Sequence, residues 1–356
     1  MTFTILLPFA LTFFITAIIT YFSIPIIRRL GLVDDPKLHK HPGIIHTKII
    51  PRSGGIPLFL GIFLVSIFFI PVSKVTIGIF LASLLSLIIG VLDDYYNAKS
   101  RDISPYLRFG VNILCAAIVV GSGVTIPFIT HPLGGILHLT IPILPFHITL
   151  GDIIAGIWII WVMNMLNWSK GIDGQMPGIV AISAIVIGIL SLRFPFVDNY
   201  VFIDANLSFI IAGAALGFLV FNFSPAKIFP GYGATSMYLL LAVVSILSSA
   251  KFATAILVMG IPIIDAIFTI VRRILSGKSP FLHDNKHLHH ILLRFGYSQR
   301  QIALFYWCFS AIVGTIALTL KSESKPFALL VLLAIVGGAL LFLHFSVRYS
   351  HEKDSS

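Results

Sequence analysis

Long apolar runs recur from one end of the chain to the other and are separated by shorter polar connections. The runs are about 17 residues or longer, close to the length of a membrane-spanning helix, and they lack the alternating ten-residue segments of an outer-membrane barrel. We therefore expect eleven transmembrane helices, at about residues 3–27, 54–72, 75–92, 107–127, 150–166, 177–193, 206–222, 236–250, 252–271, 303–320 and 326–346.

Composition supports the same class of protein. Hydrophobic residues make up 57% of the 356 residues and charged residues only 11%, far from the usage of a soluble domain. The first run, from Thr4 to Ile27, is too long for the core of a signal peptide, so we expect a retained helix. The prediction is an all-α integral membrane protein with one polytopic domain, residues 1–356.

The distribution of lysine and arginine predicts the orientation. If the connections after the odd-numbered helices and the C-terminal tail face the cytoplasm, they contain 19 of the 24 basic residues. The exceptions are Lys74, Arg193, Lys251, Lys321 and Lys325. The N-terminus is then outside and the C-terminus inside. Anionic lipid headgroups would balance the net charge of +10, so no nucleic-acid partner is required. The uncharged outer connection, residues 128–149, could form a short hairpin.

The first inward connection is rich in basic and histidine residues. It contains DDPKLHKH and later PRSGG, with Lys48 and Arg52 between and within these stretches. A glycine turn beside fixed cations can bring backbone N–H groups to a phosphate. A solvated basic connector is the simpler interpretation, and the two are compatible.

Two adjacent carboxylates, Asp93 and Asp94, close the third apolar run. They repel each other and meet the negative end of the helix dipole, so something must compensate for their charge. A divalent cation that bridges carboxylate and phosphate oxygens would do so. Alternatively, the pair is a solvated helix end whose charge is met by Lys99 and Arg101.

Another polar cluster follows the fifth run. Asn164 and Asn167 lie three residues apart on one helical face, and the glycines of KGIDG permit a tight turn that presents Asp173. Amides near a helix end can instead join neighbouring helices. The density of polar groups favours a functional site.

The ninth run contains an acid, and a histidine cluster follows it. Asp265 lies inside the run, where a carboxylate is a functional candidate unless it pairs with Arg272 or Arg273. The connection continues to His287, His289 and His290. These histidines could ligate a metal, bind phosphate or line a surface loop.

Taken together, the ordered motifs resemble the polyprenyl-phosphate N-acetylhexosamine-1-phosphate transferase family, of glycosyltransferase 4 type. The matching segments are DDPKLHKH with PRSGG, GVLDD, NMLNWSKGIDG, AKIFPG, PIIDAIFTIVRR and GKSPFLHDNKHLHH. The HLHH form resembles the branch of undecaprenyl-phosphate GlcNAc-1-phosphate transferases more than the peptidoglycan translocases.

The resemblance implies transfer of a sugar-1-phosphate from a UDP-sugar to a polyprenyl phosphate, giving UMP and a polyprenyl-diphospho-sugar at the cytoplasmic face of the plasma membrane. It implies Mg²⁺ as cofactor and a homodimer as a plausible assembly. Asp93 and Asp94 would be catalytic residues and, with Asp173, metal ligands. Substrate-binding residues would be Lys48, Arg52, Asn164, Asn167, Lys170, Tyr232, His287, His289 and His290.

Two positions depart from the family pattern. Lys170 stands where the first acid of a DGxDG motif is expected, and Tyr232 stands where a GDxGS motif has its magnesium-binding acid. We hypothesise that Lys170 supplies part of the positive charge of a metal and that Tyr232 donates its hydroxyl to a phosphate. The alternatives are a degenerate homologue that binds lipid or nucleotide without turnover, and a transporter of lipid-linked sugars.

Overall fold

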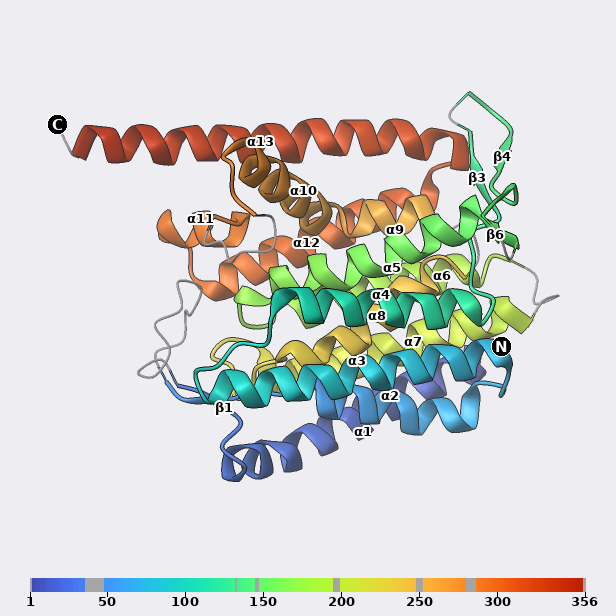
Figure 1. Ribbon diagram of the computed structural model, residues 1–356, viewed down its shortest axis with the longest axis horizontal. Helices are drawn as coiled ribbons and strands as arrows, with labels where there is room; N and C mark the ends of the chain where they lie inside the picture. The colour runs from blue at the N-terminus through green and yellow to red at the C-terminus, as the bar shows by residue number, and fades with distance from the viewer. Residues whose placement is uncertain are drawn as a thin grey trace.

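The computed structural model describes residues 2–35, 48–131, 133–144, 147–194, 199–247, 252–279 and 286–354. The chain folds into a bundle of roughly antiparallel helices (Figure 1). The first half contains α1 (Thr2–Arg29), α2 (Gly55–Phe69), α3 (Lys74–Ala98), α4 (Pro105–Gly121), α5 (Leu150–Trp168), the 3-10 turn η2 (Ser169–Gly171) and α6 (Gln175–Ser191). The second half contains α7 (Asn199–Asn222), η3 (Tyr232–Ala234), α8 (Thr235–Val244), α9 (Phe252–Val258), α10 (Gly260–Leu275), α11 (Leu288–Arg294), α12 (Gln299–Thr319), η5 (Ser322–Ser324) and α13 (Lys325–Asp354).

Three helices begin at capping boxes that the sequence encodes. The side chains of Ser73, Thr149 and Ser298 accept hydrogen bonds from the backbone three residues later, at the starts of α3, α5 and α12. The side chain of that third residue in turn accepts a hydrogen bond from the backbone N–H of the cap residue. Two N–H groups that the helix leaves unsatisfied therefore have partners. These caps fix where the polar connections give way to helix.

Short antiparallel strand pairs mark the two ends of the bundle. Strands β3 (Phe128–Thr130) and β4 (Ile136–His138) pair, as do β5 (Pro142–Leu144) and β6 (Ile148–Thr149). They confirm the hairpin predicted for the outer connection. Strand β1 (Val33–Asp34) pairs with β2 (Ile50–Pro51) and lies with α11 at the opposite end of the bundle (Figure 1).

The prediction of an all-α membrane protein is confirmed. A helix lies in each of the eleven predicted ranges. Among the described residues, six helices are long and apolar enough to cross a membrane, and seven if α9 and α10 form one broken span. The apolar helices α2, α4, α6 and α8 are shorter.

The prediction of one continuous helix over residues 252–271 is wrong. Helices α9 and α10 meet at an angle of 79°. Met259 separates them, and Pro262 lies in the first turn of α10. Proline lacks the N–H that would bond to the carbonyl four residues earlier, that of Val258, so a straight helix cannot continue through this point.

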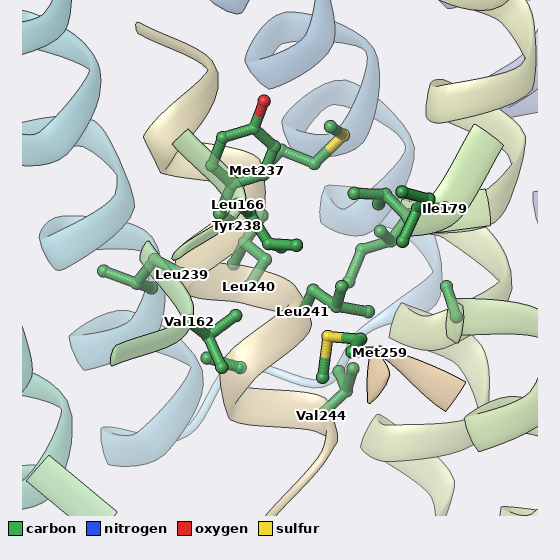
Figure 2. Packing of buried hydrophobic residues seen from close by; sticks show 14 of the residues in the cluster. Val162, Leu166, Ile179, Met237, Tyr238, Leu239, Leu240, Leu241, Val244 and Met259 are labelled. Atoms are coloured by element: carbon green, nitrogen blue, oxygen red, sulfur yellow. The ribbon is translucent and has the colours of Figure 1, made fainter. Parts of the chain in front are cut away.

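The core is centred on α8. All ten residues of α8 are buried, and the helix packs against α3 and α5. Figure 2 shows Met237 to Leu241 surrounded by side chains of α5 and α6, among them Leu166 and Ile179. Because η3 leads directly into α8, this packing fixes the position of the connection that carries Tyr232.

Candidate functional site

Arg52 joins three polar residues beside the β1–β2 strand pair. It follows β2 directly, and its backbone N–H donates to Leu32 O. Its Nε donates to Asp94 Oδ1 (2.9 Å), and its Nη1 donates to Asn97 Oδ1 (2.7 Å) and Asp34 Oδ2 (3.3 Å). Charge-assisted bonds of this kind hold the guanidinium in one orientation.

The PRSGG turn binds the connection that precedes η3. Phe229 N–H donates to Pro51 O (2.8 Å), while Gly54 N–H and Gly55 N–H donate to Phe229 O (3.0 Å) and Pro230 O (2.9 Å). These main-chain bonds join the PRSGG and AKIFPG motifs, which are far apart in the sequence. The glycines of PRSGG therefore allow two backbones to meet.

Asp93 and Asp94 lie in the last turns of α3 and are buried. Asp94 Oδ1 also accepts from Tyr232 N–H (2.9 Å), and both oxygens of Asp93 accept from Arg108 Nη1 (3.3 and 3.4 Å). Arg52 and Arg108 thus offset the repulsion between the two acids. The alternative interpretation assigned this role to Lys99 and Arg101.

Asp94 Oδ2 is the one carboxylate oxygen of this pair that lacks a hydrogen-bond partner among the described residues. It faces Gly231, where an added Cβ would lie 2.1 Å from it. Gly231 has a φ of +69°, in the left-handed region that favours glycine. The backbone therefore closes against this oxygen in a way that no other residue at position 231 permits without movement.

Lys170 reaches the same place from η2. Its Nζ donates to Asn167 Oδ1 (2.7 Å) and Gly231 O (3.0 Å). It lies 5.5 Å from the centre of the Tyr232 ring. The Tyr232 hydroxyl accepts from Asn112 Nδ2 at 3.4 Å. The two residues that depart from the family pattern are thus neighbours in the structure.

Asp173 connects three other segments. Its Oδ2 accepts from Ala226 N–H (3.0 Å), and its own N–H donates to Gln299 Oε1 (3.2 Å). Within the part of the chain that the structure describes, no three His, Cys, Asp or Glu side chains are arranged to hold a metal ion. The metal set of Asp93, Asp94 and Asp173 stays a prediction.

The histidine cluster is built on α10 and α11. His287 Nδ1 lies 2.7 Å from Asp265 Oδ2, and Leu288 N–H donates to Asp265 Oδ1 (2.9 Å). The rings of His287 and His289 are parallel with centres 5.7 Å apart, and His290 lies 4.3 Å from His289. The carboxylate of Asp265 thereby sets the orientation of His287 and the start of α11.

His289 links this cluster to the η2 turn. A Cβ at Gly171 would lie 2.5 Å from His289 Nε2, so the ring packs directly against η2. Burial lowers the pKa of His289, and the neighbouring His290 and His287 lower it further. The ring is therefore neutral at physiological pH and can accept a hydrogen bond.

Two predicted site residues have no part in these contacts. Asn164 Nδ2 donates to Ile160 O of its own helix (2.7 Å). Lys48 is exposed at the edge of the described chain. His39, His41 and His46 of the first connection lie outside the described residues, so their positions are not tested.

Arg108 and Asn112 of α4 are site residues that the sequence motifs did not predict. Arg108 was visible only as one of the inward-facing basic residues, and nothing in the pattern marked Asn112. The available signal was positional: Arg108 lies in the first turn of the helix after Asp93, on the same predicted side of the membrane. A cation so placed is within reach of a carboxylate at the preceding helix end.

Comparison with known proteins identifies the family. The sequence profile of glycosyl transferase family 4 matches residues 76–249. An undecaprenyl-phosphate alpha-N-acetylglucosaminyl 1-phosphate transferase of Haemophilus influenzae is 32% identical, over 86% of this chain and 86% of the relative.

Two further relatives are also similar to this chain over most of their length. A probable undecaprenyl-phosphate N-acetylglucosaminyl 1-phosphate transferase of Bacillus subtilis is 29% identical, over 91% of this chain and 88% of the relative. A decaprenyl-phosphate N-acetylglucosaminephosphotransferase of Mycobacterium leprae is 29% identical, over 84% and 80%. With its ordered motifs gathered at one end of a helical bundle, the chain belongs to glycosyl transferase family 4.

Proposed function

We propose that this protein transfers GlcNAc-1-phosphate from UDP-GlcNAc to a polyprenyl phosphate. The observation that carries the proposal is the position of Asp94, which joins Arg52 of PRSGG and the backbone of Tyr232 at the end of α3. Three motifs thus form one charged site in a chain whose relatives are named as transferases of this kind. The product would begin a lipid-linked glycopolymer of the cell envelope.

In this reaction, an oxygen of the acceptor phosphate forms a bond to the β-phosphorus of the donor. The bond from that phosphorus to the α,β-bridging oxygen breaks, and its electron pair leaves with UMP. Both reactants are anions, so the main requirement is cations that reduce repulsion and stabilise the leaving phosphate. Arg52, Arg108 and Lys170 are the cations at this site.

Asp93 and Asp94 act in this proposal by holding these cations. A phosphate monoester has a second pKa of about 6, so the acceptor is already mostly dianionic at neutral pH. A carboxylate base is then a smaller requirement than correctly placed positive charge. Asp94 orients Arg52, and Asp93 orients Arg108.

Mg²⁺, the cofactor implied by the resemblance, stays a prediction. The described residues fit this ion poorly, because three of the four oxygens of Asp93 and Asp94 already accept hydrogen bonds from cations or backbone. Asp94 Oδ2 is the oxygen that remains for a ligand. When bound, the ion would polarise the phosphates of the substrates.

The membrane arrangement is also part of the proposal. Eleven spans with the N-terminus outside would place the β1–β2 pair, α11 and the site at the cytoplasmic face of the plasma membrane, where UDP-sugars are available. Cysteine-accessibility labelling at the β3–β4 hairpin and at Lys278 would test this, because only the hairpin should react from outside. Mass photometry in detergent would test the expected homodimer.

The activity is tested by UMP release from the purified protein in detergent. We expect release with UDP-GlcNAc only when polyprenyl phosphate is present, and loss of release in Asp94→Asn. Glu323→Gln is the control for loss of a carboxylate charge, since Glu323 is exposed in η5 and takes no part in the described cluster. No release with any of a panel of UDP-sugars would instead favour the degenerate, binding-only role.

A further inference from the structure

Lys170 keeps one donor available for a ligand. A lysine ammonium has three N–H groups. Two of them donate to Asn167 Oδ1 and Gly231 O, and no described residue accepts the third. The half-buried side chain is thus held in place with one donor unused inside the charged site.

Two further cations share the aromatic rings that flank Lys170. Its Nζ lies 5.5 Å from the centre of the Tyr232 ring and 5.9 Å from that of Phe229. Arg108 lies over the Tyr232 ring at 5.2 Å, and Arg52 lies over the Phe229 ring at 5.9 Å. Three positive charges therefore converge on one short connection, which is what a diphosphate requires.

These cations are balanced by acids within the site. Asp34 and Asp94 pair with Arg52, and Asp93 pairs with Arg108. Counted at their ordinary charges, the three carboxylates and the three cations give a local sum of zero before any substrate binds.

A tightly bound divalent ion would disturb this balance. Magnesium requires near-octahedral oxygen ligands, and Asp94 Oδ2 is the one oxygen of Asp93 and Asp94 that it could take without displacing a hydrogen bond. An ion held there would share the site with the Lys170 ammonium and be repelled by it. Lys170, which donates to Gly231 O, already provides a positive charge at this site.

We propose that the Lys170 ammonium binds the diphosphate of the UDP-sugar and stabilises the charge that develops on departing UMP, so that donor binding needs no divalent ion. This inference rests on the proposed function. No proton is transferred: the electron pair of the breaking bond stays on the UMP oxygen, and the third N–H of Lys170 donates to a phosphate oxygen.

The test is the binding of UDP-GlcNAc to the purified full-length protein in detergent, by calorimetry, with magnesium and with EDTA. We expect the wild-type Kd to change by less than about threefold between the two conditions. Lys170→Met should raise the Kd in EDTA by roughly ten- to a hundredfold, the effect of losing a charged hydrogen bond. Lys170→Gln, which keeps a polar donor but no charge, should give an intermediate value.

Lys278→Met is the matched control, because Lys278 is exposed in the connection after α10 and takes no part in the cluster. Its Kd should equal that of the wild type. Thermal unfolding of each variant shows whether the protein is folded. Should Lys170→Met be misfolded, Lys170→Gln carries the test.

The inference is overturned if EDTA abolishes donor binding to the wild type, or if both folded Lys170 variants bind in EDTA as well as the wild type does. Failure of the proposed function looks different. In that case the donor binds through Lys170 in EDTA, yet no UMP is released under any condition.

Discussion

The Asp94 and Asp265 clusters both place a buried carboxylate beside a basic side chain, but the basic partners differ in kind. Asp94 holds Arg52, whose guanidinium is always charged, at 2.9 Å. Asp265 holds His287, an imidazole whose ring nitrogens can each donate or accept a hydrogen bond, at 2.7 Å. The first cluster provides a permanent charge, whereas the direction of the hydrogen bonds in the second depends on the tautomer of its ring.

The largest effect is expected from removing the charge of the permanent cluster. Asp94→Asn leaves Arg52 with a neutral partner and should lower the free energy of unfolding by about 3 kcal/mol, as is typical when a buried pair is broken. UMP release should fall by at least roughly a hundredfold, since about 2.7 kcal/mol of lost stabilisation has that effect. Unfolding in detergent and UMP release measure the two changes, and Glu323→Gln, at an exposed position of η5, should alter neither.

The next largest effect is expected from a substitution at Gly231, where the backbone approaches Asp94 closely. Gly231→Ala brings a methyl group within contact of Oδ2 and forces alanine into the left-handed region, so we expect a loss of about 3 kcal/mol. Gly277→Ala is the matched control, because Gly277 has a similar φ of +67° with nothing within 4 Å. Equal losses in the two variants would show that strain alone, and not Asp94, sets the cost.

A smaller effect is expected in the second cluster. Asp265→Asn keeps an acceptor for His287 and Leu288 but removes the charge. The difference between a charged and a neutral hydrogen bond is about 1.4 kcal/mol, which corresponds to a tenfold decrease in UMP release. Thermal unfolding is measured in parallel. A lower rate accompanied by an equal loss of stability would mean that Asp265 is only structural.

The smallest effect concerns pH and stability. Burial lowers the pKa of His289 in the folded protein, so the unfolded chain binds a proton first as the pH falls below about 6.5. Stability is therefore full above that pH and should decrease by on the order of 1 kcal/mol toward pH 5. His289→Gln should remove this decrease, as followed by thermal unfolding. His138→Gln, at an exposed position of β4, should retain it.

The sequence predicted the class of the protein and most of the charged site, because polar residues stand out in an apolar chain. Asp94, Lys170 and His287 all follow or end apolar runs. It did not predict the α9–α10 break, although Pro262 was visible, because hydropathy alone does not register a bend. The partners of each acid depend on packing between helices. For this reason the cation observed beside Asp93 is Arg108, on the next helix, and not the predicted Lys99.

The complete burial of the short helix α8 has a consequence for the assembly of the protein in the membrane. A ten-residue helix is about 15 Å long, half the thickness of the hydrocarbon layer, so α8 cannot cross a bilayer alone. Its terminal carbonyl and N–H groups would lie in lipid without partners. The packing of α3 and α5 around α8 supplies what its length cannot, so the position of Tyr232 depends on assembly of the bundle.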